Sequence, residues 1–207
     1  MSTKSFIINL PIITGDQDRR RLRKSFSFGC NLQNAVMGGG WDRVLQMRAT
    51  AEWQATRAMP KGRERTKAFR DLRVRFRLSE YDFHADVAKH RKASGRCHLL
   101  GINESQKLAS RAWISVERHL YNGGSPRFIS SRRGLHSIEG KTNRTGIIWK
   151  ADQQCVTVCK HVYRVRVDKS DDWLTRALQD PTDPTKPRKV KYCRIVREMR
   201  KGKECYF

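Results

Sequence analysis

The sequence predicts a mixed α+β protein in which an N-terminal strand joins a sheet of C-terminal strands, with a helical segment inserted between them. Three observations predict this fold. Residues 4–11 form a short β-like run that ends at a proline, residues 14–122 carry apolar residues at helical spacing, and residues 126–207 contain short β-like runs separated by polar turns. We therefore expect 1–13 to be the first strand, 14–122 the helical insertion and 123–207 the remainder of the β domain.

The first helix is expected to begin at Asp16, because Gly15 precedes it and acidic residues occupy its first turn. It should end near residue 36, where the run Gly38-Gly39-Gly40 follows. Residues 41–58 carry apolar residues at helical spacing again, so we expect a second, half-buried helix there.

The middle of the chain predicts three more helices. Residues 63–78 are a very basic helical stretch, and residues 79–92 continue with apolar residues at helical spacing. Asn103 or Ser105 can cap the next helix. This helix should end at the segment 122–126, which is rich in glycine and contains a proline.

The last third of the chain changes to strand-like patterns. A brief helix at 173–178 and a loop with three prolines at 181–187 interrupt it. The last strand begins only a few residues before Phe207, so we expect the sequence to be truncated. The β-like runs are 127–130, 146–150, 155–159, 163–167, 190–197 and 204–207.

The charge balance indicates a polyanionic partner. The 207 residues include 44 Lys and Arg but only 20 Asp and Glu, a formal net charge of +24. The excess is +5 over residues 1–60, +10 over 61–140 and +9 over 141–207, so it is not confined to a tail. Lys and Arg bind phosphates and release counterions, and no long amphipathic helix favours a membrane instead. We expect a nucleic-acid-binding protein of the bacterial cytoplasm, associated with the nucleoid, without a transmembrane segment or secretory signal.

The cysteines leave two alternatives open. Cys155 and Cys159 could bind zinc with Cys193 and Cys205, or with His161, but no second close pair of ligands matches them. The strand-like alternation around them favours ordinary buried thiols, and no cofactor is expected in this chain.

Three groups of residues are candidates for nucleic-acid contact. Four arginines of the basic helix could follow a phosphate backbone, although a solvated helix face is the alternative. In the loop after residue 122, three arginines flank an aromatic side chain. This side chain could stack on a base or belong to the core. A helix start could enter the major groove, or its residues could simply cap the helix. These groups are Arg63, Arg70, Arg73 and Arg77; Arg127, Phe128, Arg132 and Arg133; and Ser105, Gln106 and Arg111.

Four segments, in this order, resemble the N-terminal half of TnpB-like proteins, the transposon-encoded RNA-guided nucleases related to type V CRISPR effectors and often labelled transposases. The first segment, 28–36, contains a Cys and then Asn34 followed by small and apolar residues. The second, 102–113, has a Ser-Gln start and an amphipathic run. The third is the Pro-Arg-Phe stretch and its continuation at 125–139, and the fourth comprises the paired strands within 190–207.

The resemblance implies a wedge-like β-barrel with a helical recognition insert, which bind guide RNA and the target-adjacent DNA duplex. It also implies a RuvC-type nuclease domain after this half, with three acidic ligands for Mg²⁺, so this chain should have no cleavage activity of its own. Its acidic residues Asp171, Asp172, Asp180 and Asp183 fall in a turn and a proline-rich loop, where a two-metal site is not expected. The alternatives are a structural RNA-binding protein of ribosomal type and a free-standing metal-dependent nuclease. The sequence does not predict an oligomeric state.

Overall fold

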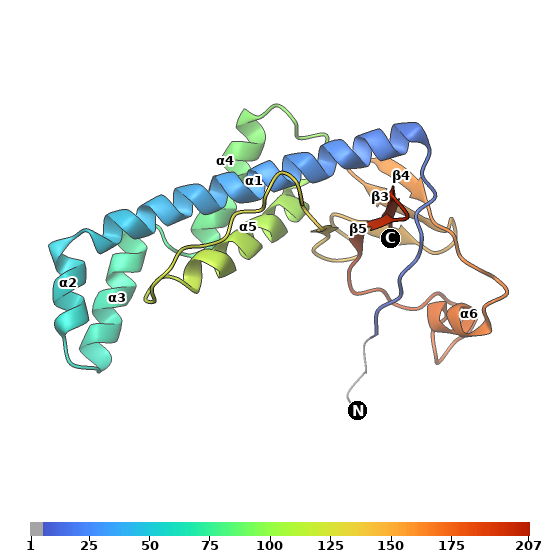
Figure 1. The fold of residues 1–207 in the computed structure, drawn as a ribbon. Helices are drawn as coiled ribbons and strands as arrows, with labels where there is room; N and C mark the ends of the chain where they lie inside the picture. Colours follow the sequence, from blue (N-terminus) through green and yellow to red (C-terminus); the bar gives the residue numbers. More distant parts are fainter. Residues whose placement is uncertain (1–5) are drawn as a thin grey trace. The chain divides into compact units, whose positions relative to one another are not determined.

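The protein is described here by a computed structural model covering residues 6–207. The fold combines helices with two small antiparallel sheets, which confirms the predicted α+β class (Figure 1). Contacts divide the chain into two compact units. The helical unit is Ser27–Gly134, and the β unit comprises the N-terminal residues through Phe26 together with Leu135–Phe207. The boundary between the two units therefore falls within the first helix.

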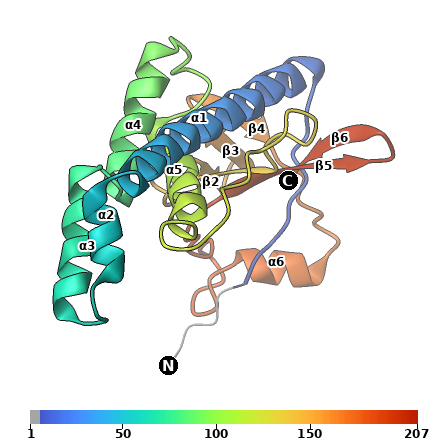
Figure 2. The ribbon, with the colours of Figure 1, turned by 60° about the vertical axis from the view of Figure 1, so that its left-hand side comes forward.

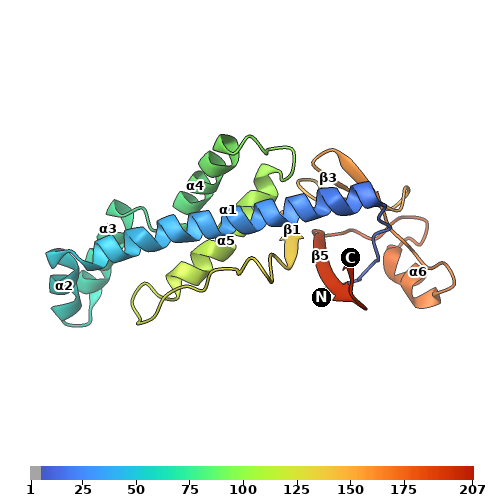
Figure 3. The same cartoon turned by 45° about the horizontal axis from the view of Figure 1, so that its top comes forward.

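Five helices precede the sheets. The pair α2 and α3 and the pair α4 and α5 each lie side by side (Figures 1 and 3). None of the helices within residues 6–207 is long and apolar enough to cross a membrane. Their bounds are α1 Asp16–Arg48, α2 Ala51–Ala58, α3 Arg63–Arg75, α4 Glu80–Ala93 and α5 Ile102–Glu117.

The predicted end of the first helix at Gly38-Gly39-Gly40 is wrong, because α1 continues through all three glycines to Arg48. A Cβ on Gly40 would lie only 2.1 Å from Cζ of Phe83 in α4. Gly40 therefore allows the fully buried Phe83 ring to pack directly on the α1 backbone. This burial offsets the cost of glycine in a helix interior, which is about 0.5–1 kcal/mol per residue.

The core of the helical unit lies around this contact. The Phe83 ring meets the ring of Trp113 in α5 edge to face, with centroids 5.3 Å apart. The guanidinium of Arg43 lies over Phe83 and its Nη1 is 2.8 Å from Oδ2 of Asp86. Edge-to-face aromatic packing and a paired cation over the ring are both favourable arrangements for a core that contains a charge.

Two other predictions for the helical unit are wrong. The helix predicted to be capped by Asn103 or Ser105 begins at Ile102, with Gly101 as its N-cap and no side-chain cap. The predicted strand at 127–130 is instead an irregular loop.

The β unit contains two three-stranded antiparallel sheets. The first has the order β1-β5-β6 and the second β2-β3-β4. The hairpin of β5 and β6 is clearest in Figure 2. No closed barrel is found among the described residues, so the observed architecture is the coarser one of two sheets. The bounds are β1 Ser137–Glu139, β2 Ile148–Lys150, β3 Cys155–Val158, β4 His161–Arg164, α6 Asp172–Leu178, β5 Arg194–Arg200 and β6 Lys203–Tyr206.

The N-terminal segment joins the two sheets, although not as the predicted strand. The strand predicted at 4–11 begins outside the described residues, and the part within them forms no strand. Instead, the N–H of Ile12 donates to the carbonyl of Tyr206 and the N–H of Ile13 to that of Arg164, both at 2.8 Å. Pro11 has no N–H to donate, but its carbonyl accepts from the Arg166 N–H at 2.8 Å.

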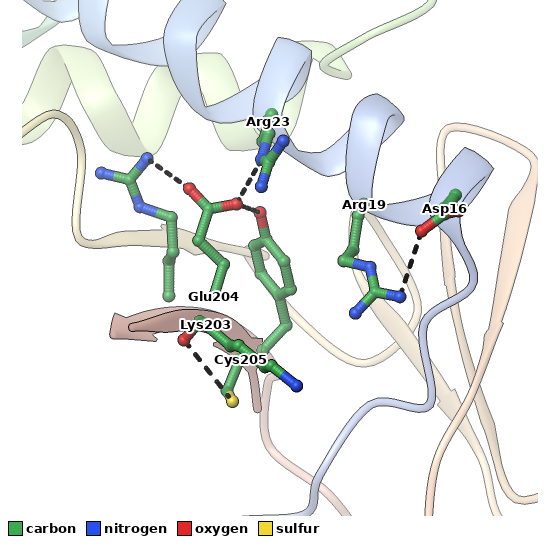
Figure 4. Close-up of polar contacts among 8 residues, drawn as sticks. Asp16, Arg19, Arg23, Lys203, Glu204 and Cys205 are labelled. Carbon is green, nitrogen blue, oxygen red and sulfur yellow. Dashed lines mark hydrogen bonds and ion pairs between the residues drawn. The ribbon is translucent and has the colours of Figure 1, made fainter. Parts of the chain in front are cut away.

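Glu204 connects β6 to the first turns of α1 within the β unit (Figure 4). Its Oε2 accepts hydrogen bonds from Nε of Arg23 at 2.5 Å and from the hydroxyl of Tyr206 at 3.0 Å. Arg197 lies 4.0 Å from Oε1 and over the ring of Phe26. Burial opposes ionisation of Glu204, but these hydrogen bonds and charges outweigh it and lower its pKa. Glu204 is therefore an ionised anchor between α1 and the β5–β6 hairpin.

Alanine at the neighbouring positions 39 and 40 should have opposite effects on stability. At Gly39 an added Cβ would meet no atom within 4 Å apart from its neighbours in the α1 backbone, so Gly39→Ala should raise the free energy of unfolding by about 0.5–1 kcal/mol. Gly40→Ala would drive a methyl group into Phe83 and should lower it by about 1–3 kcal/mol. Urea unfolding followed by far-UV circular dichroism measures both values. Similar effects of the two substitutions would contradict the packing role of Gly40.

Candidate nucleic-acid interface

A loop of the helical unit, residues 122–134, is fastened to α1 by the side chain of Asn34. Its Nδ2 donates to the carbonyl of Ile129 at 2.9 Å, and its Oδ1 accepts from the N–H of Ile129 at 3.0 Å. One helix side chain thus satisfies both backbone groups of a loop residue, which replaces the sheet partner that the predicted strand would have had.

Phe128 is held beside this contact and remains 51% exposed. Its ring approaches the helix at Gly38, where an added Cβ would lie 3.7 Å from Cε1. One part of the ring therefore rests on the α1 backbone while the remainder faces solvent. Of the two alternatives for Phe128, a core residue or a stacking residue, this exposure favours stacking.

Three arginines of the same loop lie within five residues of Phe128 in the sequence. Arg127 and Arg132 are exposed, and neither forms an ion pair or hydrogen bond with its side chain within residues 6–207. Arg133 is also exposed, and its N–H donates to the Ser130 hydroxyl at 3.3 Å. The loop thus carries exposed cations together with an exposed ring, and at least two of the cations have no carboxylate partner among the residues described.

The start of the loop is fixed by Arg48, which the sequence did not single out. Its guanidinium donates to the carbonyls of Leu120 at 3.3 Å and Asn122 at 2.7 Å, and also to that of His119. It lies over the Trp41 ring at 5.3 Å. Burial lowers the pKa of Arg48, and the charge of Arg57 adds to this effect. Arg48 therefore closes the end of α5 and positions the loop.

The four candidate arginines in and after α3 separate into two kinds. Arg63 is exposed and has no ion pair in the described part of the chain, while Arg70 is exposed and lies 3.8 Å from Asp71. Arg73 and Arg77 instead hold the fold together. Their different environments separate residues that the sequence pattern grouped on one helix face.

Arg73 is half-buried over the ring of Trp113 at 5.2 Å. Its Nη2 lies 3.6 Å from Glu117 and its Nε donates to the Leu78 carbonyl at 3.3 Å. These contacts connect the end of α3 to α5.

Arg77 follows α3 with a positive φ of 52°, the left-handed conformation that often terminates a helix. Its guanidinium lies 3.5 Å from Asp82 and 3.4 Å from Asp86 of α4. Arg77 therefore turns the chain from α3 into α4 and pairs with the acidic first turns of α4.

The α5 candidates lie at a helix start that is buried. Ser105 is fully buried, and its hydroxyl donates to the Gly101 carbonyl at 2.8 Å. Gln106 and Arg111 are only partly exposed. A duplex could reach Gln106 and Arg111 more readily than Ser105, whose hydrogen bond and burial are those of a structural residue.

Glu104, one position before Ser105, is 1% exposed, and neither carboxyl oxygen forms a well-aligned hydrogen bond in the described part of the chain. Burial raises its pKa, although the nearby N–H groups of Glu104 and Gly101 and the charge of Arg91 act in the opposite direction. Arg91 itself is held by the carbonyls of Leu100 and Cys97 at 2.7 and 3.0 Å.

The acidic residues that were considered as metal ligands occupy structural positions in the β unit. Asp171 caps α6 by accepting from the N–H of Leu174 at 2.9 Å. A hydrogen bond from Thr182 lowers the pKa of Asp180, and hydrogen bonds from Lys186 and Thr185 lower that of Asp183. Asp172 lies exposed in the first turn of α6.

No disulfide joins any of the six cysteines. His161, the alternative zinc ligand, lies with Nε2 2.9 Å from Oδ1 of Asp18. Within residues 6–207, no three His, Cys, Asp or Glu side chains are grouped as they would be around a metal ion.

Comparison of this chain with protein families, curated proteins and solved structures finds no match.

Glu104→Gln should change stability in a pH-dependent way. Because burial raises the pKa of Glu104 in the fold, wild-type protein loses stability relative to the variant as the pH rises above about 4.5, the ordinary pKa of the group, and the loss levels off above the folded-state pKa. The free energy of unfolding of the variant minus that of wild type should therefore grow from pH 4 to pH 8. Urea titrations across this range measure the difference.

The matched control is Glu64→Gln, at an exposed glutamate in the first turn of α3. It removes the same negative charge at an exposed position. A flat difference for Glu104→Gln would show that the carboxyl group is not destabilised by burial.

Proposed function

We propose that the chain binds nucleic acid, and that the loop 122–134 contacts a single-stranded segment with its arginines on phosphates and Phe128 against a base. The observation that carries the proposal is the half-exposed ring of Phe128, in a loop that the Asn34–Ile129 hydrogen bonds fasten and that also carries exposed arginines. Base stacking on an aromatic ring and arginine–phosphate contacts are the two elements of single-strand recognition.

The charge distribution supports phosphate as the partner of the arginines. Acidic residues in the helical unit pair with Arg43, Arg73, Arg75 and Arg77, all within the fold. Arg63, Arg127 and Arg132 have no such partner within the described residues, so an external anion would meet less competition there. We assign phosphate contact to these three and to the exposed Arg70 ahead of Arg73 and Arg77.

At the finer level, we propose that the chain is the RNA- and DNA-binding half of a TnpB-like RNA-guided nuclease. The resemblance rested on separate segments, and two of them meet in space, because Asn34 belongs to the first and Ile129 to the third. Guide RNA is the proposed single strand, and Gln106 and Arg111 remain the proposed contacts to a DNA duplex.

The wedge-like barrel is part of the same proposal. The backbone of Ile12 and Ile13 bridges the ends of β6 and β4. At a second junction, a Cβ on Gly140, next to β1, would lie 2.8 Å from the N atom of Ile147, next to β2. Close approaches at both junctions are what a barrel made of the two sheets would need.

Removing the arginines of the loop should weaken binding without weakening the fold. For the double variant Arg127→Gln and Arg132→Gln, the slope of log K against log salt for a single-stranded RNA should become shallower by about 0.7 for each phosphate that the variant no longer neutralises. The melting temperature should stay close to that of wild type, because neither side chain has a partner within the described residues. Fluorescence anisotropy over a salt series measures the slope.

Arg73→Gln is the control, since it removes a cation with structural partners. It should lower the melting temperature by several degrees and change the salt slope less than the double variant does. An unchanged slope in the double variant would overturn the loop as the phosphate-binding site.

The bound RNA distinguishes the finer proposal from its alternative. If the chain is TnpB-like, RNA that co-purifies with it from its host should be enriched for one structured transcript encoded next to its gene. Sequencing the co-purified RNA measures this enrichment. Enrichment of ribosomal RNA instead would favour the ribosomal-type protein, and absence of both bound RNA and salt-dependent binding would exclude both.

A further inference from the structure

The β unit contains a solvent-open cavity of about 420 Å³, and none of the candidate nucleic-acid contacts named above lines it. Its walls come from β2, the β2–β3 turn, the segment after β4, α6 and the proline-rich loop 181–187. The apolar residues of the lining include Trp149, Leu178 and Pro184. This volume falls within the usual range for small-molecule sites.

The walls of this cavity are held in place by the fold. The N–H of Trp149 donates to Oδ1 of Asn143 at 2.7 Å, and Nδ2 of Asn143 donates to the Trp149 carbonyl at 3.3 Å. At α6 and the proline-rich loop, Nε of Arg188 donates to the Gln179 carbonyl at 3.0 Å, and the Asp180 N–H donates to the Lys186 carbonyl at 2.9 Å. A site fixed in this way loses little conformational entropy when a ligand binds.

The polar groups in the lining are of two kinds. Lys186 is paired with Asp183 at 2.8 Å and is thereby partly neutralised. The side chains of Gln154, Lys169 and Gln179 form no hydrogen bond or ion pair with any residue in the range 6–207. The lining residues thus include a tryptophan, two glutamines and a lysine that no described carboxylate neutralises.

We propose that this cavity binds one unstacked nucleotide of a single-stranded nucleic acid, an inference that rests on the proposed function. The base would stack on Trp149, and the carboxamides of Gln154 and Gln179 would form hydrogen bonds with its edge. Lys169 would bind the adjacent phosphate. Because the net charge of the protein is +24, it attracts a polyanionic ligand more strongly than an uncharged peptide or a neutral metabolite.

The direct test follows the indole N–H signals of the five tryptophans by nuclear magnetic resonance in ¹⁵N-labelled protein. The probes are short oligoadenylates of RNA and of DNA, a duplex, and free AMP and adenosine. A single-stranded probe should shift the Trp149 signal and leave that of Trp173, which is 58% exposed outside the cavity lining, nearly unchanged. RNA and DNA arms identify which strand is preferred, and a shift with either supports the site.

Three outcomes would overturn the proposal. The first is a Trp149 signal that does not move while fluorescence anisotropy shows that the strand is bound. The second is a shift with the duplex but not with single strands. The third is a shift with free AMP that no oligonucleotide reproduces, which would assign the cavity to a free nucleotide instead.

Substitutions separate stacking from packing. Trp149→Leu should weaken single-strand binding about 5- to 100-fold, whereas Trp149→Phe should retain most of the affinity because it keeps an aromatic face. Trp173→Leu is the matched control and should bind like wild type. Equal losses for Leu and Phe at position 149 would indicate a structural role and contradict stacking.

Lys169→Gln tests the phosphate contact. Wild-type protein should bind AMP more tightly than adenosine, and the substitution should abolish that preference, whereas Lys141→Gln at an exposed lysine outside the cavity should not. An unchanged preference would remove Lys169 from the site.

The loop variants show whether a negative result contradicts only the nucleotide site or nucleic-acid binding as a whole. If Arg127→Gln and Arg132→Gln weaken binding but the Trp149 substitutions do not, the nucleotide site fails and nucleic-acid binding stands. If wild-type protein binds no nucleic acid at all, the proposed function itself fails.

Discussion

The structure is governed by a shortage of carboxylates. With 44 basic residues and only 20 acidic ones, the chain cannot neutralise most of its cations internally, and self-repulsion opposes compaction. Several of the acidic residues that form ion pairs lie where elements meet. Glu204 connects α1 to the β5–β6 hairpin, and Asp82 and Asp86 connect α4 to the turn after α3. Cations without such a partner are therefore the ones that an external polyanion would bind with least competition.

Local patterns predicted most helices and strands, because their signals lie within a few residues of each element. The helices at α3, α4 and α6 and the strands at β2 and β3 follow directly from spacing and turn residues. The extent of α1 did not, since glycine opposes helix locally and Gly40 is stabilised by Phe83, which is distant in the sequence. The N-terminal segment was also misread, because its hydrogen-bond partners at Tyr206 and Arg164 come from distant strands.

The sequence predicted several residues of the candidate site but not the contacts that these residues form in the fold. The loop arginines and Phe128 could be named from sequence because they are close together in it. Arg73 and Arg77 could not be separated from Arg63, since the difference depends on whether Glu117 or Asp86 lies nearby in the fold. Arg48 carried no local signal at all, because its partners are backbone carbonyls that every residue possesses. Asn34 was noted only through the family resemblance, and its contact with Ile129 gives it a physical role.

Chemical labelling with phenylglyoxal, which reacts with arginine, distinguishes the structural arginines from the ligand-binding ones directly. Mass spectrometry measures the labelling of each arginine with and without bound single-stranded RNA. The account predicts that Arg63, Arg127 and Arg132 are labelled in the free protein and protected by RNA. Arg73 and Arg77, which already have carboxylate partners, should be labelled slowly in both states. Protection by RNA at Arg73 and Arg77 while Arg127 and Arg132 remain reactive would contradict it.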